Sequence, residues 1–409
     1  MKKLAIIASL LLAASSPAVA QTQLVKDVKQ QAKSVKDYDA YKKLVETLKP
    51  AFTNPETAQM AETYFIPGKT GFDVYDAYIL QKSLGGDIDT KAMGRSLLDG
   101  YNFFMKAFEY DSLPDAKGKV KPKFSKDMVN VIVGHVNDFD QAAVGFWQAR
   151  DYEGAYEAWD ALLDIPSNPR YAKSNIKHYP DTVIAEIRYN QGLAAWQAGR
   201  LDSAMTAFDK SIALGNTNPQ LFEYAYSVAY AAKNKEAQKR YAREGFNRFG
   251  TSDPRFLQWT VNGYIEDKDF DTATKMLKDA IAADPNNGAY YYSAGILEES
   301  RKNNDAAKGY YQKGIELNPD FPGNYLNLGR VLAEEYDALD QATGNMSQAD
   351  YNKYAAETLV PLLKESAKNF EKAYEINNEL DDALKYLKNI YYRLNDNANY
   401  ERVNKLLGY

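Results

Sequence analysis

A 34-residue period between residues 254 and 320 limits what this chain can fold into more than any other feature of its sequence. Small, large and proline positions recur one period apart: Ala273, Leu277, Ala280, Ile281 and Pro285 return as Ala307, Tyr311, Gly314, Ile315 and Pro319. Small residues on one face let two helices approach closely, and the proline ends the helix because it cannot continue one. A period of this length is typical of stacked helical hairpins. The sequence therefore predicts an all-α fold, an α-α superhelix (solenoid) of hairpins.

The same pattern extends over most of the chain. The fragments WQARDYEGAYEAW at residues 147–159 and WQAGRLDSAMTAF at residues 196–208 match each other at a spacing of 49 residues. This spacing is one period plus 15 residues, and a polar linker around residues 167–180 accounts for the difference. Together with the period above, these fragments resemble the tetratricopeptide repeat (TPR) family over residues 136–407, and more weakly over residues 54–112. The resemblance implies seven or eight hairpin units.

Prolines, glycines and changes in composition divide the chain into successive regions. Pro67 and Gly68 are expected to end one helix in the N-terminal part, because proline disrupts a helix interior. The expected regions are a signal peptide at 1–20, an N-terminal helical region with divergent TPR-like repeats at 21–112, a lysine-rich loop at 113–126, a TPR array at 127–335, an insertion at 336–361, and C-terminal hairpins with a cap at 362–409.

The N-terminal 20 residues have the layout of a secretory signal. Lys2 and Lys3 precede an apolar run from Leu4 to Ala14, and small residues at 18–20 form a cleavage site before Gln21. The apolar run is too short to span a bilayer, and no second run of sufficient length follows, so no transmembrane segment is expected. The chain has no cysteine, which excludes a lipid-modified cysteine, a disulfide and a thiolate metal site. We expect an exported, periplasmic protein.

Charge argues against nucleic acid as a partner. Removal of residues 1–20 leaves 48 basic and 55 acidic side chains, a net charge of −7, whereas nucleic-acid binding needs a cationic surface. The lysines of residues 113–126 are interpreted as a solvated surface loop, with partner binding as the alternative. Residues 22–49 are interpreted as an amphipathic helix or helix pair that opens the solenoid, with membrane-surface binding as the alternative.

No motif predicts an enzyme, a cofactor or a metal. The two histidines, His135 and His178, lie far apart in the sequence without a cysteine near either, and a closed metal site needs more ligands. Asp267, Asp269 and Asp271 resemble the start of a calcium loop, but Thr272 and Lys278 stand where the loop needs glycine and glutamate. An active site built from the 336–361 insertion is the remaining enzymatic alternative.

The resemblance to the TPR family implies a concave face lined by the first helix of each unit. Its second, fifth, ninth, twelfth and thirteenth positions point inward in that family. The candidate binding residues from these positions are Tyr189, Trp196, Phe222, Tyr226, Asn262, Tyr292 and Arg330. The alternative is that a tight superhelix buries the aromatic members against neighbouring units. TPR domains that clamp a terminal carboxylate carry Lys at the fifth and Asn at the ninth position, and only Asn262 fits, without its lysine.

The predicted function is a non-enzymatic scaffold of the bacterial cell envelope that binds a partner protein or peptide in this concave groove. A glycan or small-ligand binder that uses the same aromatic groove is the alternative. Self-association is also plausible, because repeat arrays expose their edges. Fold alone does not name the partner.

Overall fold

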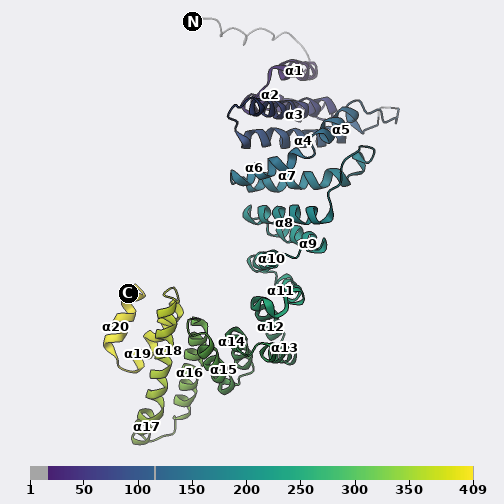
Figure 1. The fold of residues 1–409 in the computed structure, drawn as a ribbon. Helices are drawn as coiled ribbons and strands as arrows, with labels where there is room; N and C mark the ends of the chain where they lie inside the picture. Colours follow the sequence, from purple (N-terminus) through teal and green to yellow (C-terminus); the bar gives the residue numbers. More distant parts are fainter. Residues whose placement is uncertain (1–16, 115–116, 409) are drawn as a thin grey trace. The chain divides into compact units, whose positions relative to one another are not determined.

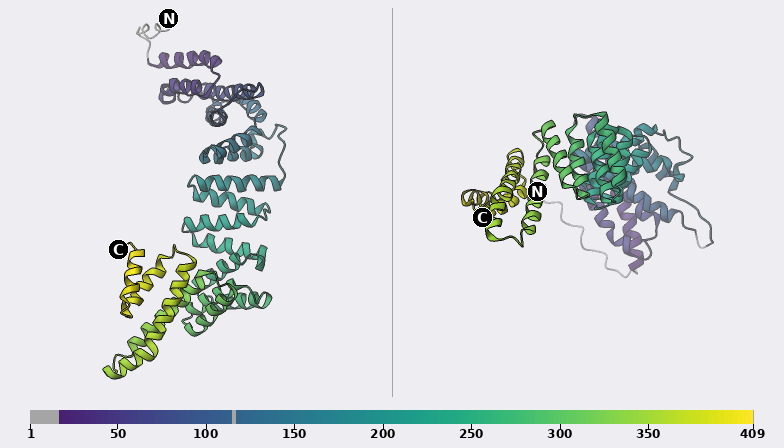
Figure 2. Two further views of the ribbon diagram at one scale, coloured as in Figure 1. Left: turned by 60° about the vertical axis from the view of Figure 1, so that its left-hand side comes forward. Right: turned by 90° about the horizontal axis from the view of Figure 1, so that it is seen from below.

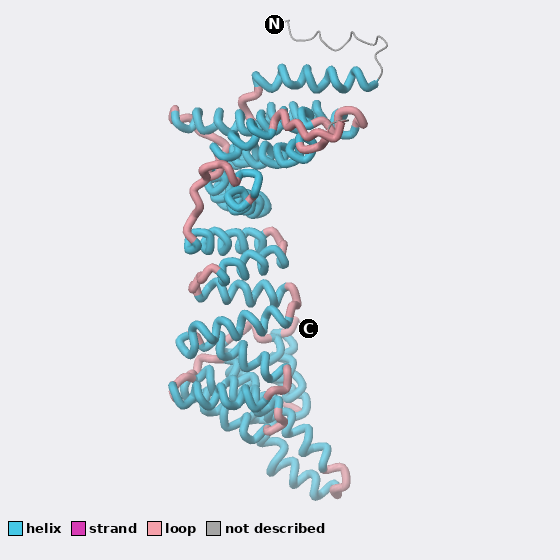
Figure 3. The backbone as a smooth tube through the Cα atoms, turned by 90° about the vertical axis from the view of Figure 1, so that its right-hand side faces the viewer, coloured by secondary structure: helices cyan, strands magenta, loops and turns pink. Residues whose placement is uncertain are grey.

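The protein is described here from a computed structural model that covers residues 17–114 and 117–408. Residues 1–16 of the expected signal peptide lie outside the described residues, while Pro17–Ala20 belong to the first helix. The described residues are helices joined by turns and loops (Figure 3), and they contain no β-strand. This confirms the all-α prediction. The chain divides into two compact units, residues 1–233 and 234–409, and each is described by itself.

The described residues of the first unit form ten α-helices, labelled in Figure 1. Their bounds are α1 Pro17–Gln31, α2 Tyr38–Thr53, α3 Ala61–Ser83, α4 Thr90–Asp111, α5 Ser125–Gly134, α6 Asp138–Gln148, α7 Tyr152–Asp164, α8 Asp181–Gln197, α9 Leu201–Ala213 and α10 Pro219–Ala231. Short 3₁₀ turns η1 Ala32–Ser34, η2 Ile165–Ser167 and η3 Pro169–Tyr171 lie between them. Helices α3 and α4, α6 and α7, and α8 and α9 pack as hairpins.

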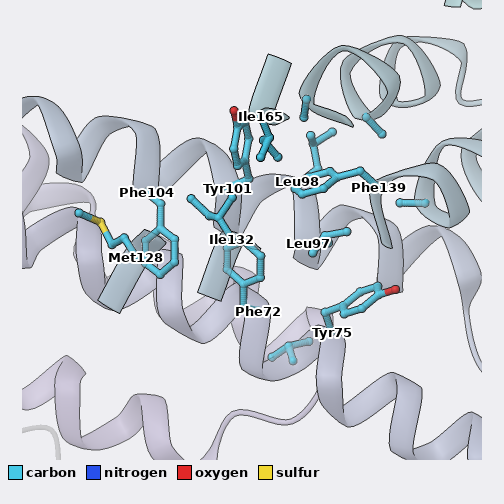
Figure 4. Close-up of a cluster of buried hydrophobic side chains, with 14 of the residues drawn as sticks. Phe72, Tyr75, Leu97, Leu98, Tyr101, Phe104, Met128, Ile132, Phe139 and Ile165 are labelled. Atoms are coloured by element: carbon cyan, nitrogen blue, oxygen red, sulfur yellow. The ribbon is translucent and has the colours of Figure 1, made fainter. Parts of the chain in front are cut away.

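The core of the first unit forms where helices α3 to α6 meet. Figure 4 shows Phe72, Leu97, Phe104, Ile132 and Phe139 buried together there, each at most 1% exposed. Burial of several large apolar side chains supplies most of the driving force for this packing. The core therefore comes from apolar contacts between neighbouring helices.

Helix α3 runs through Pro67 and Gly68, so the prediction that these residues end a helix was wrong. Both residues are buried against α4, where a Cβ atom on Gly68 would lie only 2.3 Å from Cδ1 of Phe104. A proline in a helix interior loses one backbone hydrogen bond, and the helix tolerates this cost where packing on both sides holds it. Tertiary packing outweighs the local preference here.

The second unit holds the remaining helices. Their bounds are α11 Lys235–Phe249, α12 Pro254–Glu266, α13 Phe270–Ala283, α14 Gly288–Ser300, α15 Asn304–Leu317, α16 Pro322–Ala342, α17 Gln348–Tyr354, α18 Val360–Ile376, α19 Asp381–Arg393 and α20 Asn397–Leu406, with the 3₁₀ turn η4 Gly250–Ser252 and the π-helix η5 Ala355–Leu359. The region expected as an insertion, residues 336–361, lengthens two repeat helices. Helix α16 continues to Ala342, and α17, η5 and α18 follow one another back beside it (Figure 2).

The 34-residue period has a direct structural cause. Gly295 of α14 faces the ring of Tyr311 in α15, where an added Cβ atom would lie 2.3 Å from Cε1. Gly192 of α8 faces Phe208 of α9 in the same way, at 2.4 Å from the same ring atom. A small residue on the first helix and an aromatic on the second thus set the spacing within a hairpin.

The turn inside each hairpin has a recurrent backbone conformation. The residue before the N-cap of the second helix has a positive φ at Arg150 (56°), Lys268 (59°) and Lys302 (62°). At two of these turns the N-cap side chain accepts a hydrogen bond from the helix: Asp151 from the amide of Gly154 and Asp269 from the amide of Thr272, both at 3.2 Å.

Candidate binding surfaces

The first unit brings three aromatic side chains together on α8 and α10. Tyr189 and Trp196, both partly buried, lie on α8 two turns apart. Tyr224 of α10 stacks on Tyr189, with ring centroids 6.5 Å apart and planes 4° from parallel. Its ring also lies 5.5 Å from that of Trp196. We call Tyr189, Trp196 and Tyr224 the aromatic cluster.

The other two predicted residues of this unit lie on α10. Phe222 is fully buried, so it is a core residue and cannot contact a ligand; for this side chain the burial alternative holds. Tyr226 is partly buried. The most exposed aromatic on the helix is Tyr230, at 69%. Large exposed aromatic side chains are the usual anchors of binding surfaces.

Burial shapes the chemistry of the aromatic cluster. It raises the pKa of the Tyr189 hydroxyl above its usual range, and the neighbouring hydroxyl of Tyr224 and the carboxylates of Glu186 and Glu223 act in the same direction. Tyr189 therefore stays neutral at physiological pH and offers a hydroxyl together with a ring face. Such a surface suits apolar or weakly polar ligand groups.

In the second unit, Arg330 is held by a carboxylate of the protein itself. Its guanidinium nitrogens lie 2.6 and 3.0 Å from the two carboxylate oxygens of Glu299, a two-point ion pair between α16 and α14. Tyr311 donates its hydroxyl to the same carboxylate at 2.5 Å. A further carboxylate, Glu334, lies 3.6 Å from Arg330. The positive charge of Arg330 is therefore already balanced.

Asn327 completes this group of side chains. It donates to the Tyr311 hydroxyl at 3.4 Å and accepts from Arg330 at 3.3 Å. Burial raises the pKa of Tyr311, and the hydrogen bond and charge of Glu299 raise it further, so the phenol stays protonated. We call Glu299, Tyr311, Asn327 and Arg330 the polar network.

The other two predicted residues of this unit, Tyr292 and Asn262, lie on α14 and α12. Tyr292 packs edge-on against Phe321, with centroids 4.9 Å apart, and its ring lies 6.2 Å from that of Tyr311. The amide oxygen of Asn262 on α12 is buried and accepts no hydrogen bond from the described residues. An unpaired buried acceptor lowers stability, so Asn262 carries a local energetic cost within the second unit.

Sequence reasoning missed the residues that join these side chains. Tyr224 stands at the seventh position of its unit, which the family's inward positions do not include. Glu299, however, stands at the twelfth position of the unit that starts at Gly288, so the same register could have found it. Tyr311 belongs to the 34-residue period, which predicted that its ring packs between helices. The period gave no indication that its hydroxyl forms a hydrogen bond.

Among residues 17–114 and 117–408, no three His, Asp or Glu side chains gather closely enough to hold a metal ion. Within the same residues, no helix is both long and apolar enough to cross a membrane. His135 of the first unit lies 3.0 Å from Asp76, between α5 and α3, through its Nε2 atom.

Comparisons with known proteins match two stretches of the chain to a repeat family. Residues 141–219 and 261–324 match the family profile described as Tetratricopeptide repeat. The chain is similar in fold to the C-terminal part of a TPR repeat-containing protein from Cytophaga hutchinsonii, with 16% identity, a TM-score of 0.38, and coverage of 64% of this chain and 92% of that one.

Other solved structures are similar over shorter stretches. PilF of Pseudomonas aeruginosa is 13% identical, with a TM-score of 0.38, and the match covers 55% of this chain and 90% of that one. A TPR protein with an unusual peptide-binding site, YrrB, is 16% identical, with a TM-score of 0.35 and coverage of 49% and 96%. No curated protein sequence matches the chain.

Proposed function

We propose that this chain, which carries tetratricopeptide repeats at residues 141–219 and 261–324, is a scaffold of the bacterial cell envelope that binds a segment of a partner protein. The TPR fold itself points to protein–protein interaction. The observation that carries the proposal is the aromatic cluster of α8 and α10, with the exposed Tyr230 on the same α10 helix. Rigid aromatic side chains supply a large contact area at low entropic cost.

Export is the second part of the proposal, and it rests on the sequence of residues 1–20. A charged start, an apolar run and small residues before Gln21 support secretion. Cell fractionation, with the mass of the recovered protein, tests it. A periplasmic protein that begins at Gln21 is the expected result, and a full-length cytoplasmic protein contradicts it.

The binding proposal is tested by crosslinking in living cells. The protein is produced with its own N-terminus and a C-terminal tag, then crosslinked and purified, and the captured proteins are identified by mass spectrometry. We expect one dominant envelope protein with the wild type. Its capture should fall strongly in W196A/Y230A, because two of the aromatic contacts are lost.

A matched control is available in the second unit. Tyr392 is 73% exposed on α19, so Y392A removes an equally accessible tyrosine from another surface. Capture should persist in Y392A, and circular dichroism should show equal helix content in all three proteins. Undiminished capture by W196A/Y230A would remove the aromatic cluster from the proposal.

A glycan ligand is the alternative that the same cluster favours, since the near-parallel rings of Tyr189 and Tyr224 join a Trp side chain. Sugar rings stack on such faces through their apolar C–H groups. Calorimetry with a panel of envelope oligosaccharides separates the two functions. Saturable heat that W196A abolishes supports the glycan, whereas no heat with any oligosaccharide removes it.

A further inference from the structure

The loop between α4 and α5 concentrates positive charge on an acidic protein. Lysines occupy positions 117, 119, 121, 123 and 126, and Asp115 is the sole acidic residue between 113 and 126 in the sequence. All described residues from 112 to 123 are exposed to solvent. We call residues 112–114 and 117–124 the lysine hairpin.

The base of the lysine hairpin is fixed by one buried carboxylate. Asp111, only 7% exposed, accepts hydrogen bonds from the amides of Lys123, Phe124 and Ser125 at 2.9, 3.0 and 2.7 Å. It also accepts from the Ser125 hydroxyl at 2.6 Å. The end of the loop is thus tied to the end of α4, which gives the hairpin a defined position on the first unit.

An aromatic contact supports the same base. Phe124 is buried and stacks on Phe65 of α3, with ring centroids 4.5 Å apart. An isolated antiparallel bridge between Pro114 and Val120 closes the loop above it. The hairpin is therefore held both by the ring contact at its base and by the backbone bridge within the loop.

Apolar side chains accompany the lysines. Leu113 is 50% exposed and Val120 is 53% exposed. Exposed aliphatic side chains interleaved with lysines are the composition that binds a membrane interface, because the apolar groups enter the headgroup region and the lysines meet anionic lipids.

We propose that the lysine hairpin docks on an anionic lipid surface. The lysines supply the attraction to the headgroups, and Leu113 and Val120 supply the apolar contact. A lipid surface fits better than an acidic peptide because the exposed residues project outward on a loop. A lipid surface can contact several residues of a protruding loop at once, whereas an extended peptide usually binds in a groove. The proposal concerns different residues from the aromatic cluster and does not depend on the proposed function.

The test is vesicle flotation with two lipid compositions, phosphatidylcholine alone and phosphatidylcholine mixed with phosphatidylglycerol. The protein is produced with its own N-terminus in every arm, so any contribution of residues 1–20 is common to all samples. We expect wild-type protein to float with the anionic vesicles and not with the neutral ones. The triple variant K117E/K119E/K121E should lose at least about tenfold in partitioning, since three attractive charges become repulsive.

The control variant is K278E/K353E/K368E, which changes the total charge equally through exposed lysines on α13, α17 and α18. It should float as the wild type does. The variant L113S/V120S should float less well than the wild type without a change in net charge. Circular dichroism and thermal melting confirm that each variant is folded.

Three results would overturn the proposal: no preference of the wild type for anionic vesicles, an equal loss in both triple variants, or unchanged flotation of K117E/K119E/K121E. A soluble polyglutamate probe tests whether an acidic polypeptide, and not a lipid surface, is the negatively charged partner of the lysines. If the hairpin lysines bind polyglutamate while the protein ignores anionic vesicles, the partner is an acidic protein and the lipid proposal fails.

Discussion

At the scale of single residues, the hairpin turns place long side chains in a backbone conformation that favours glycine. Lys268 has φ 59°, and Gly199 occupies the equivalent turn between α8 and α9 with φ 77°. A residue with a Cβ atom is sterically strained at positive φ, whereas glycine loses more conformational entropy when the chain folds.

We therefore expect opposite effects from exchanges at these two turns. K268G should raise the free energy of unfolding by about 0.5 kcal/mol, and G199A should lower it by about 1 kcal/mol. Urea denaturation followed by circular dichroism measures both. Destabilisation by K268G would mean that the lysine side chain makes a contact worth more than the strain.

Asp111 gives a pH-dependent contribution to stability. Burial acts to raise its pKa, but hydrogen bonds from the Ser125 hydroxyl and from the amides of Lys123, Phe124 and Ser125 outweigh burial and hold the pKa below its usual range. A carboxylate with a depressed folded pKa stabilises the fold above its unfolded pKa, near 3.8, and loses that contribution as pH falls through the folded value.

D111N should therefore cost about 1–3 kcal/mol at neutral pH, since the NH2 group of asparagine would replace a carboxylate oxygen that accepts from backbone amides. The difference in melting temperature between D111N and wild type should shrink below about pH 4, where the wild-type carboxyl also becomes neutral. A difference that stays constant down to acid pH would show that the carboxylate charge is not the cause.

At the scale of elements, the contact between α14 and α15 depends on the absence of a side chain. A Cβ atom on Gly295 would meet the Tyr311 ring, whereas nothing lies within 4 Å of the same position on Gly309, in α15. G295A should destabilise the protein by about 1–3 kcal/mol through overpacking. G309A should stabilise it by up to about 1 kcal/mol, because alanine favours a helix.

These two variants form a matched pair, since both replace a helical glycine by alanine in adjacent helices. Thermal melts of each variant and of the double variant provide the measurement. Equal effects of the two exchanges would show that helix propensity alone, and not the spacing between α14 and α15, decides stability at Gly295.

The period predicted the hairpins because the same small-to-aromatic contact recurs between paired helices, as at Gly295 and Gly192. It could not predict that α3 continues through Pro67 and Gly68, since Gly68 packs against Phe104 of another helix. Nor could it foresee that residues 336–361 lengthen α16 and α18, because their apolar residues lack the repeat spacing. Helix boundaries cannot be predicted from neighbouring residues alone where contacts between residues distant in the sequence determine them.

The candidate binding residues were also predicted only in part. The positional rule found Tyr189, Trp196 and Arg330, which take part in the clusters that the structure shows. It placed Phe222 on a binding surface, although this ring is in the core, and it omitted Tyr224, which stacks between its neighbours on α8. Which way a ring points depends on the twist between successive hairpins, and sequence spacing does not contain that twist.

At the scale of the whole molecule, the chain consists of repeats that contact their neighbours along the sequence. Such arrays unfold with limited cooperativity, because no single core joins their ends. Trp147, Trp159 and Trp196 lie in the first unit and Trp259 in the second, so W259F confines tryptophan fluorescence to the first unit.

We expect the urea transition of W259F followed by fluorescence to differ in midpoint from the one followed by circular dichroism, which reports both units. The reference is wild-type circular dichroism, which shows whether W259F itself shifts stability. Coincident transitions from both probes would instead indicate one cooperative unit of unfolding.

The ion pair of Arg330 also determines which ligands the second unit can distinguish. A ligand carboxylate that approaches this guanidinium must compete with Glu299, which is tethered nearby at an effective concentration on the order of millimolar or higher. An acidic group therefore gains little at this surface, because it must first break the two-point contact between Glu299 and Arg330. Arg330 is thus already neutralised within the protein, and we expect this surface of the second unit to discriminate against anionic groups although it carries an arginine.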